Sequence, residues 1–111
     1  MVNPAEVPTV DVPELPGEFA LLDVRENYEW AAGHAPQAVH IPMGELPGRL
    51  GELPEADRLY VICRSGVRSA NVAAWLNGQG REAVNVAGGM ESWQANGLPM
   101  VTDQGAEPQV V

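Results

Sequence analysis

Residues 59–79, LYVICRSGVRSANVAAWLNGQ, combine a short apolar run, a tight turn and a helical pattern. The first four residues, 59–62, have the aromatic and β-branched character of a buried strand. From Val67 onward apolar side chains recur at helical spacing, and glycines at 78 and 80 favour the end of the helix there. A strand that turns directly into a helix is the repeating unit of α/β proteins with a parallel sheet.

The same alternation of strand and helix extends on both sides of this unit. The run at 19–24 is almost continuously apolar, which is typical of a strand covered on both faces. The chain is therefore predicted to form an α/β domain with a mostly parallel sheet. The pattern predicts strands at 19–24, 38–41, 59–62 and 83–86, helices at 27–32, 67–79 and 90–96, and a weaker helical segment at 44–53.

Length and composition are those of one ordinary globular domain. The chain has 111 residues, of which 45% are hydrophobic and 19% charged, and this is enough for a single modest core. We expect residues 8–100 to form the domain and residues 1–7 and 101–111 to be loose termini. Nothing in the sequence requires more than a monomer.

The chain is strongly acidic, with 15 Asp and Glu residues, 6 basic residues that are all arginine, and a formal net charge of −9. Such a surface repels nucleic-acid phosphates and anionic lipid, so neither nucleic acid nor a membrane is an expected partner. No apolar run approaches the ~20 residues that cross a bilayer, and the N-terminus lacks the pattern of a signal peptide. These features predict a cytoplasmic protein in which any anion site is built locally.

Cys63 is the single cysteine of the chain, so the sequence offers no internal disulfide, CxxC motif or metal-binding cysteine pair. It follows a predicted strand and precedes a helix, where α/β sheets bind ligands. Backbone N–H groups at a helix start stabilise an anion, and a thiolate beside arginine is the first to benefit. A buried, inert cysteine is the alternative, but the surrounding arginines and glycine favour a nucleophile.

The six residues after Cys63 carry groups suited to holding an anion. A glycine permits a positive backbone angle or a close approach of ligand. Two serines can cap the helix or donate hydrogen bonds, and two arginines can hold the oxygen atoms of an anionic substrate. We therefore predict a nucleophile inside an anion-binding loop, which comprises Arg64, Ser65, Gly66, Val67, Arg68 and Ser69.

Three motifs, in order along the chain, resemble those of the rhodanese-like domains. CRSGVRS at 63–69 resembles their persulfide loop. Residues 21–42, LLDVRENYEWAAGHAPQAVHIP, resemble the stretch that usually reads LDVRexxEwxxGHIpgAxnIP, and residues 86–100, VAGGMESWQANGLPM, resemble the closing GGxxaWxxxGxPv. The resemblance spans about residues 8–100. It implies a rhodanese fold, with a mostly parallel five-stranded sheet flanked by helices on both faces.

The resemblance also implies a sulfurtransferase that needs no metal or organic cofactor. Cys63 would take a sulfane sulfur from a small anionic donor such as thiosulfate and carry it as a persulfide. Backbone N–H groups from Arg64 to Ser69 would hold the persulfide, and Arg64 and Arg68 would hold the donor. The acceptor would be cyanide or an outside thiol, on a small molecule or another protein, because the chain has no second cysteine.

Two other function classes stay open. Cysteine phosphatases and related arsenate reductases use a longer C-x5-R loop, whereas four residues separate Cys63 from Arg68. The shorter loop fits one sulfur atom better than a tetrahedral oxyanion, which makes this alternative the weaker one. The other is a persulfide carrier or partner-binding module without thiosulfate turnover, which the presence of Cys63 does not exclude.

Polar residues outside the loop are predicted to support it. Asp23 and Arg25, at the end of the predicted strand 19–24, are expected to form a buried ion pair in preference to contacting substrate. His34 is interpreted as a hydrogen-bonded structural histidine, with a role as general acid for the acceptor step as the alternative. Glu29 is expected to support the site or to be solvated.

Overall fold

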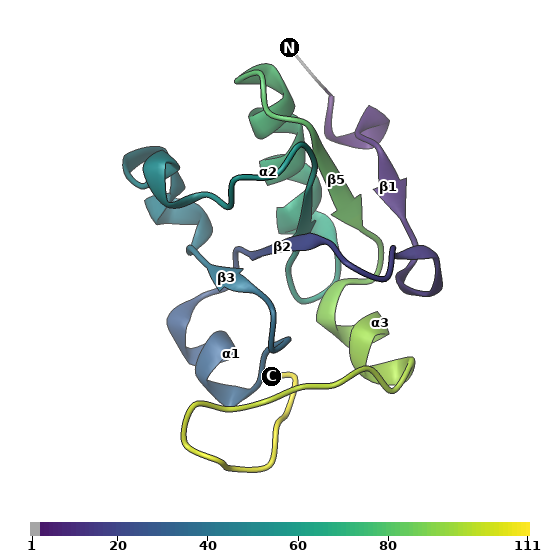
Figure 1. Cartoon of the computed structure of the whole chain (residues 1–111), viewed down its shortest axis with the longest axis vertical. Coiled ribbons are helices and arrows are strands. Elements are labelled where there is room, and N and C mark those ends of the chain that lie inside the picture. The colour runs from purple at the N-terminus through teal and green to yellow at the C-terminus, as the bar shows by residue number, and fades with distance from the viewer. Residues whose placement is uncertain (1–2) are drawn as a thin grey trace.

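A parallel sheet of five strands forms the centre of the molecule (Figure 1). The structure is a computed structural model and describes residues 3–111. The strands are ordered β1-β5-β4-β2-β3 across the sheet, and every pairing between neighbours is parallel. In chain order they are β1 (Thr9–Val10), β2 (Ala20–Asp23), β3 (Val39–His40), β4 (Leu59–Ile62) and β5 (Ala83–Val86).

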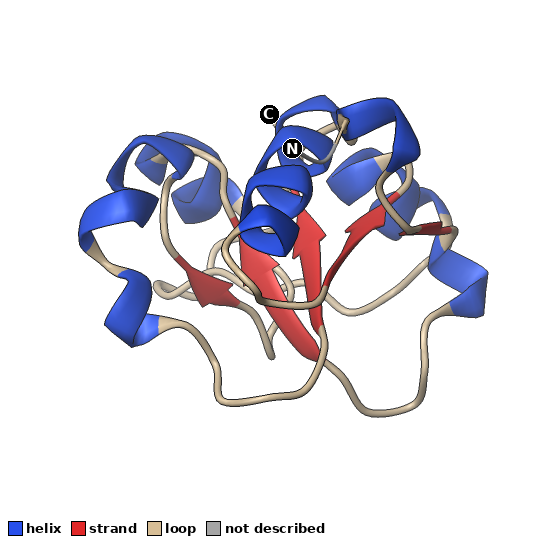
Figure 2. Ribbon diagram, turned by 90° about the horizontal axis from the view of Figure 1, so that it is seen from above, coloured by secondary structure: helices blue, strands red, loops and turns tan. Residues whose placement is uncertain are grey.

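Helices connect the strands and surround the sheet. Figure 2 shows the strands in the middle of the molecule and helices beyond both edges of the sheet. The α-helices are α1 (Asn27–Ala32), α2 (Val67–Gly78) and α3 (Gly89–Ala95), and the 3-10 helices are η1 (Pro4–Glu6), η2 (Val12–Glu14), η3 (Met43–Gly48) and η4 (Leu50–Glu52).

Alternate residues of the central strand β4 face two separate hydrophobic clusters. Leu59 and Val61 pack in a cluster with side chains of α2, while Tyr60 and Ile62 pack in a second cluster with Trp93 of α3. All five side chains are buried. The sheet is therefore covered on both faces, and the predicted α/β class with a five-stranded parallel sheet is confirmed.

The edge strand β1 is the one that the apolar pattern does not predict. Thr9 and Val10 pair with Asn85 and Val86 of β5. A strand of two residues shows too little alternation to be recognised from sequence, and it forms here because β5 offers an open edge.

The segment predicted to be weakly helical at 44–53 consists of two 3-10 helices, η3 and η4. Pro47 lies inside η3, where it lacks the N–H that an α-helix would use. Between the two helices Arg49 leaves the helical region, with φ −129° and ψ 25°. The predicted helical segment is therefore present, and its proline and glycine residues limit it to short 3-10 turns.

Residues 101–111 lie against α1, in contrast to the loose terminus expected from their composition (Figure 1). Val101 forms an antiparallel bridge with His34. The N–H of Gln109 donates to the carbonyl oxygen of Ala32 at 2.8 Å. Val110 packs against the hydrophobic cluster that contains Trp93. These contacts are mostly through the backbone, so the pattern of side chains along residues 101–111 carries no sign of them.

The N-terminal residues also contact the core. Val7, expected within a loose terminus, is buried in the cluster that packs against α2. Met1 and Val2, which belong to the same expected terminus, lie outside the described residues.

Candidate active site at Cys63

Cys63 lies at the carboxyl end of β4, the middle strand of the sheet, and is 1% exposed. The chain turns at once through Gly66, which has φ +106°, and α2 begins at Val67. Gly66 adopts the left-handed conformation that its lack of a side chain permits. The cysteine is thus held between the end of a buried strand and the start of a helix, the arrangement expected from the sequence.

Two hydrogen-bond donors are directed at the Cys63 sulfur. The backbone N–H of Gly66 lies 3.1 Å from Sγ, and the hydroxyl of Ser69 lies 3.2 Å from it. Both groups can stabilise negative charge on the sulfur. Of the remaining loop residues, Ser65 and Val67 are exposed.

Asn85 is a residue of this site that the sequence analysis missed. It lies on β5, it is buried, and its Oδ1 accepts from the Ser69 hydroxyl at 2.6 Å. The hydroxyl carries one hydrogen, so Asn85 and the Cys63 sulfur compete for it. A polar residue within the apolar strand 83–86 was the available signal, because a buried amide requires a partner.

The first residues of α3 pack directly behind the loop. The N–H of Met90 donates to the carbonyl oxygen of Cys63 at 2.8 Å. Gly89, with φ +55°, comes so close that a Cβ atom there would lie 2.4 Å from the same oxygen. A Cβ on Gly66 would in turn lie 3.2 Å from the nitrogen of Gly88. Close backbone packing around Cys63 thus requires glycine at position 89, and at position 66 the positive φ favours glycine beside a tighter than usual contact.

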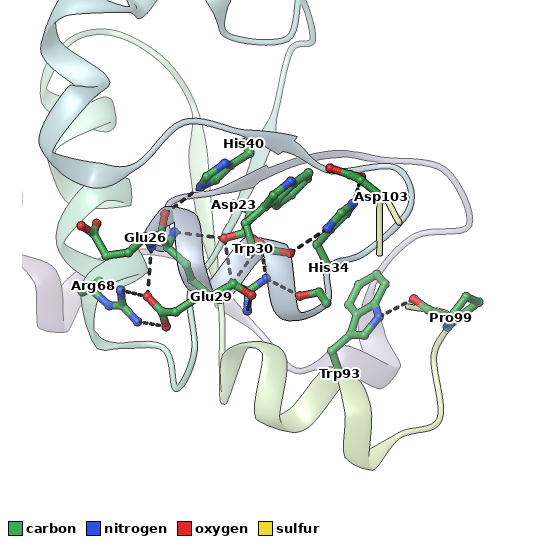
Figure 3. Close-up of polar contacts among 12 residues, drawn as sticks. Asp23, Glu26, Glu29, Trp30, His34, His40, Arg68, Trp93, Pro99 and Asp103 are labelled. Atoms are coloured by element: carbon green, nitrogen blue, oxygen red, sulfur yellow. Dashed lines mark hydrogen bonds and ion pairs between the residues drawn. The ribbon is translucent and has the colours of Figure 1, made fainter. Parts of the chain in front are cut away.

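Arg68 is bound to a carboxylate from another helix. Its two terminal nitrogens donate to the two oxygens of Glu29 on α1, at 2.7 and 2.9 Å (Figure 3). The hydrogen bond from Arg68 lowers the pKa of Glu29 against the opposing effect of burial, and the same bond raises the pKa of Arg68. The guanidinium predicted to hold an anionic donor therefore has its charge balanced within the protein.

Arg64 makes a looser contact at the mouth of the loop. Its Nε lies 3.4 Å from a carboxylate oxygen of Glu91 on α3, and both side chains are 52% exposed. Such an exposed pair adds little stability and can rearrange readily.

Asp23 and Arg25 form the buried ion pair that the sequence predicted. The side chains are 0% exposed, and Arg25 Nη2 lies 2.8 Å from Asp23 Oδ2. Arg25 also donates to the carbonyl oxygens of Gly33 at 2.8 Å and of Glu29 at 3.3 Å. The contacts of this enclosed pair join the end of β2 to α1 and to Gly33 after it.

His34 and His40 both stack on Trp30, with ring-centroid distances of 3.5 and 4.6 Å (Figure 3). Nδ1 of His34 lies 3.0 Å from the carbonyl oxygen of Trp30, and its Nε2 lies 3.4 Å from Asp103. Nε2 of His40 lies 2.8 Å from the carbonyl oxygen of Arg25. The His34 ring is therefore held between Trp30 and Asp103, and its structural role stays a prediction.

Within residues 3–111 no three His, Cys, Asp or Glu side chains are grouped closely enough to hold a metal ion. The helices of the same residues are all too short or too polar to cross a membrane.

Comparison with known proteins agrees with this geometry. The family model described as Rhodanese-like domain matches residues 11–96. The Bacillus subtilis protein YtwF, whose name describes a candidate sulfurtransferase, is 48% identical over 82 residues, which cover 74% of this chain and 80% of that protein. A protein of Allochromatium vinosum named sulfurtransferase is 40% identical over 89 residues, 79% of this chain and 83% of that one.

Among solved structures, the crystal structure of a rhodanese-related protein from Thermoplasma volcanium superposes with a TM-score of 0.80 at 31% identity. The match covers 86% of this chain and 99% of that chain. The family indicated by the three sequence motifs is confirmed, and the chain belongs to the rhodanese-like domain family.

Proposed function

We propose that this chain is a sulfurtransferase that carries a sulfane sulfur as a persulfide on Cys63. The observation that carries the proposal is the setting of the Cys63 sulfur, which ends the central strand with the Gly66 N–H and the Ser69 hydroxyl directed at it. Donors fixed around a sulfur favour its anionic form, which is the nucleophile in sulfur transfer.

With thiosulfate as donor, the Cys63 thiolate attacks the outer sulfur. A sulfur–sulfur bond to Cys63 forms, the sulfur–sulfur bond of the donor breaks, and its electron pair leaves with sulfite. In the second step an acceptor thiolate or cyanide attacks the outer persulfide sulfur, and the electron pair of the broken bond returns to Cys63 as thiolate. We assign the backbone N–H groups from Arg64 to Ser69 to the outer sulfur.

The tight packing of the loop supports sulfur transfer over phosphoryl or arsenate chemistry. The Gly66 N–H folds back onto the Cys63 sulfur at 3.1 Å, and Gly89 fits against the Cys63 carbonyl with no room for a Cβ atom. Only four residues separate Cys63 from Arg68. A loop this closely supported is better matched to one sulfur atom than to a tetrahedral oxyanion.

A persulfide carrier is the second candidate, and the pairing of Arg68 with Glu29 favours it. A carrier would receive sulfur from another persulfide and would need less positive charge at the loop than a thiosulfate enzyme. In both cases the acceptor thiol must be reduced, which fits a reducing compartment such as the cytoplasm.

The intact mass of the reduced protein, before and after thiosulfate, tests the proposal directly. Because Cys63 is the only cysteine, a gain of one sulfur atom that dithiothreitol reverses reports a persulfide at that position. The Cys63→Ser variant is the control and is expected to gain nothing. If wild type gains no sulfur from thiosulfate or from a low-molecular-weight persulfide, the proposal fails and hydrolysis of a phosphate ester is the next assay.

A further inference from the structure

We propose that Glu29 determines donor specificity, so that the site favours sulfane-sulfur donors with one negative charge, such as an organic persulfide, over the thiosulfate dianion. The inference rests on the proposed function and adds the charge class of the donor to it. It depends on how the cations around Cys63 are paired.

The Glu29 carboxylate is held by Arg68 of α2 and by the backbone just before its own helix, α1. Its oxygens accept from the guanidinium of Arg68 at 2.7 and 2.9 Å, and one of them also accepts from the backbone N–H of Glu26 at 3.0 Å (Figure 3). The residue is 2% exposed. A buried carboxylate held on both sides does not swing away when an anion approaches, so its negative charge acts on the donor as a fixed charge.

Carboxylates outnumber arginines at the loop. Arg68 is paired with Glu29, and Glu26 adds a second negative charge that acts on the same guanidinium. Arg64 faces Glu91 at 3.4 Å. The Asp23–Arg25 pair is enclosed and neutral as a whole. A dianion that approaches Cys63 therefore meets the N-terminus of α2 without a net surplus of side-chain cations, in a chain whose net charge is −9.

Donor charge matters because the Coulomb energy is proportional to it. Thiosulfate brings two negative charges and releases sulfite, whereas an organic persulfide brings one. With the persulfide, the Cys63 thiolate forms a bond to the outer sulfur, the donor sulfur–sulfur bond breaks, and the electron pair leaves with the donor thiolate, which takes a proton from solvent. A fixed negative charge beside the site therefore opposes thiosulfate twice as strongly as it opposes a donor with one charge.

The test compares two donors that undergo the same reaction and differ in charge. Thiosulfate carries two charges, and the methanethiosulfonate anion, CH3–SO2–S⁻, carries one. kcat/KM for each is measured in wild type and in Glu29→Gln, which keeps the size of the side chain and a hydrogen bond to Arg68. Loading of Cys63 is followed in parallel by intact mass.

For an assumed separation of about 6 Å between the Glu29 carboxylate and the donor, in a dielectric close to that of water, removing the charge is expected to raise kcat/KM for thiosulfate about tenfold and that for methanethiosulfonate about threefold. Added salt should reduce both gains. Glu52→Gln is the matched control: Glu52 also binds an arginine through both oxygens, but in η4, and the variant should change neither value.

Equal changes for the two donors, or a fall for both, would overturn the inference, because Glu29 would then only position Arg68. Glu26→Gln provides a second variant at an exposed position, and it should give the same ratio of effects at a smaller size. If neither donor adds sulfur to Cys63 in wild type, the proposed function itself fails. That result is distinct from a persulfide that forms without the predicted charge preference.

Discussion

Two arginine–carboxylate pairs lie close to the Cys63 loop, and they differ in their access to water. Asp23 and Arg25 are 0% exposed, whereas the side chain of Arg68 in its pair with Glu29 is 31% exposed. Arg25 satisfies its remaining donors with backbone carbonyl oxygens. The first pair belongs to the base of the loop, together with Asn85 and Gly89, and the second pair forms part of its rim.

The difference separates two tasks. A fully buried ion pair is tolerated only when every polar atom has a partner, so the base holds one geometry and is costly to disturb. The rim pair is open on one side, and its charge can act on a molecule at the mouth of the loop. We therefore expect changes in the base to act mainly on stability and changes in the rim to act mainly on donor preference.

The largest effect is expected from Arg25→Met, which leaves the Asp23 carboxylate buried without its partner. Breaking a buried pair in this way typically costs about 3–5 kcal/mol. Urea unfolding of wild type and variant measures the loss. The double variant Asp23→Leu/Arg25→Met removes both charges and should recover part of it. A loss below about 1 kcal/mol in the single variant would mean that the base is not held by this pair.

Gly89→Ala comes next, because the new Cβ would lie 2.4 Å from the Cys63 carbonyl oxygen at a φ of +55°. Gly97→Ala is the matched control, since Gly97 also has a positive φ, +72°, but has no neighbouring atom within 4 Å. The control should lose only the backbone term of about 1–2 kcal/mol. Gly89→Ala should lose more free energy of unfolding and should also slow persulfide formation. Equal losses in the two variants would mean that the close approach of Gly89 to the Cys63 carbonyl does not stabilise the site.

Asn85→Leu tests whether Asn85 controls the Ser69 hydroxyl beside the Cys63 sulfur. Losing the amide that accepts from Ser69 is expected to cost about 1–3 kcal/mol. It also leaves the Ser69 hydrogen with the Cys63 sulfur as its remaining acceptor, which stabilises the thiolate. The rate of alkylation by iodoacetamide at fixed pH should rise a few-fold in this variant. In a Ser69→Ala background the same substitution should leave the rate unchanged, and a persisting effect would show that Asn85 acts by another route.

These residues also show where inference from the sequence ends. The strand, the loop and the helix around Cys63 are contiguous in the sequence, so local pattern and the chemistry of one short stretch predicted them correctly. Asn85 reaches Ser69 from another strand, and Glu29 reaches Arg68 across 39 positions. Such pairings follow from the order of strands in the sheet, which the apolar pattern alone does not determine.

The prediction for Arg68 shows the same limit in its chemistry. The residue type and its place beside Cys63 indicated an anion-binding cation, but the carboxylate that balances it was described only as a supporting or solvated residue. The backbone contacts of residues 101–111 were likewise not visible in composition, because a carbonyl oxygen and an N–H are present at nearly every position.

The pair of Arg68 with Glu29 makes a contribution to stability that depends on pH in the acid range. The pKa of Glu29 is lowered from its ordinary 4.5, chiefly by the hydrogen bond from Arg68. A lowered pKa in the folded state means that the stabilisation is complete above 4.5 and is lost as pH falls through the folded value. Glu29→Gln should therefore cost about 1 kcal/mol at neutral pH, and urea unfolding should show this difference shrinking below pH 4.5. A difference independent of pH would mean that packing is what Glu29 contributes.

The smallest effect is expected for the outer contact of the rim, between Arg64 and Glu91. Both side chains are 52% exposed and the two atoms are 3.4 Å apart, so water competes for each charge. Glu91→Gln should change the free energy of unfolding by less than about 0.5 kcal/mol. Its effect on thiosulfate should be smaller than that of Glu29→Gln, because an exposed carboxylate is screened and can move away from a donor. If Glu91→Gln changes kcat/KM for thiosulfate as much as Glu29→Gln or more, the charge that selects the donor lies on α3 instead of α1. Donor specificity would then not follow from the fixed position of Glu29 beside Arg68.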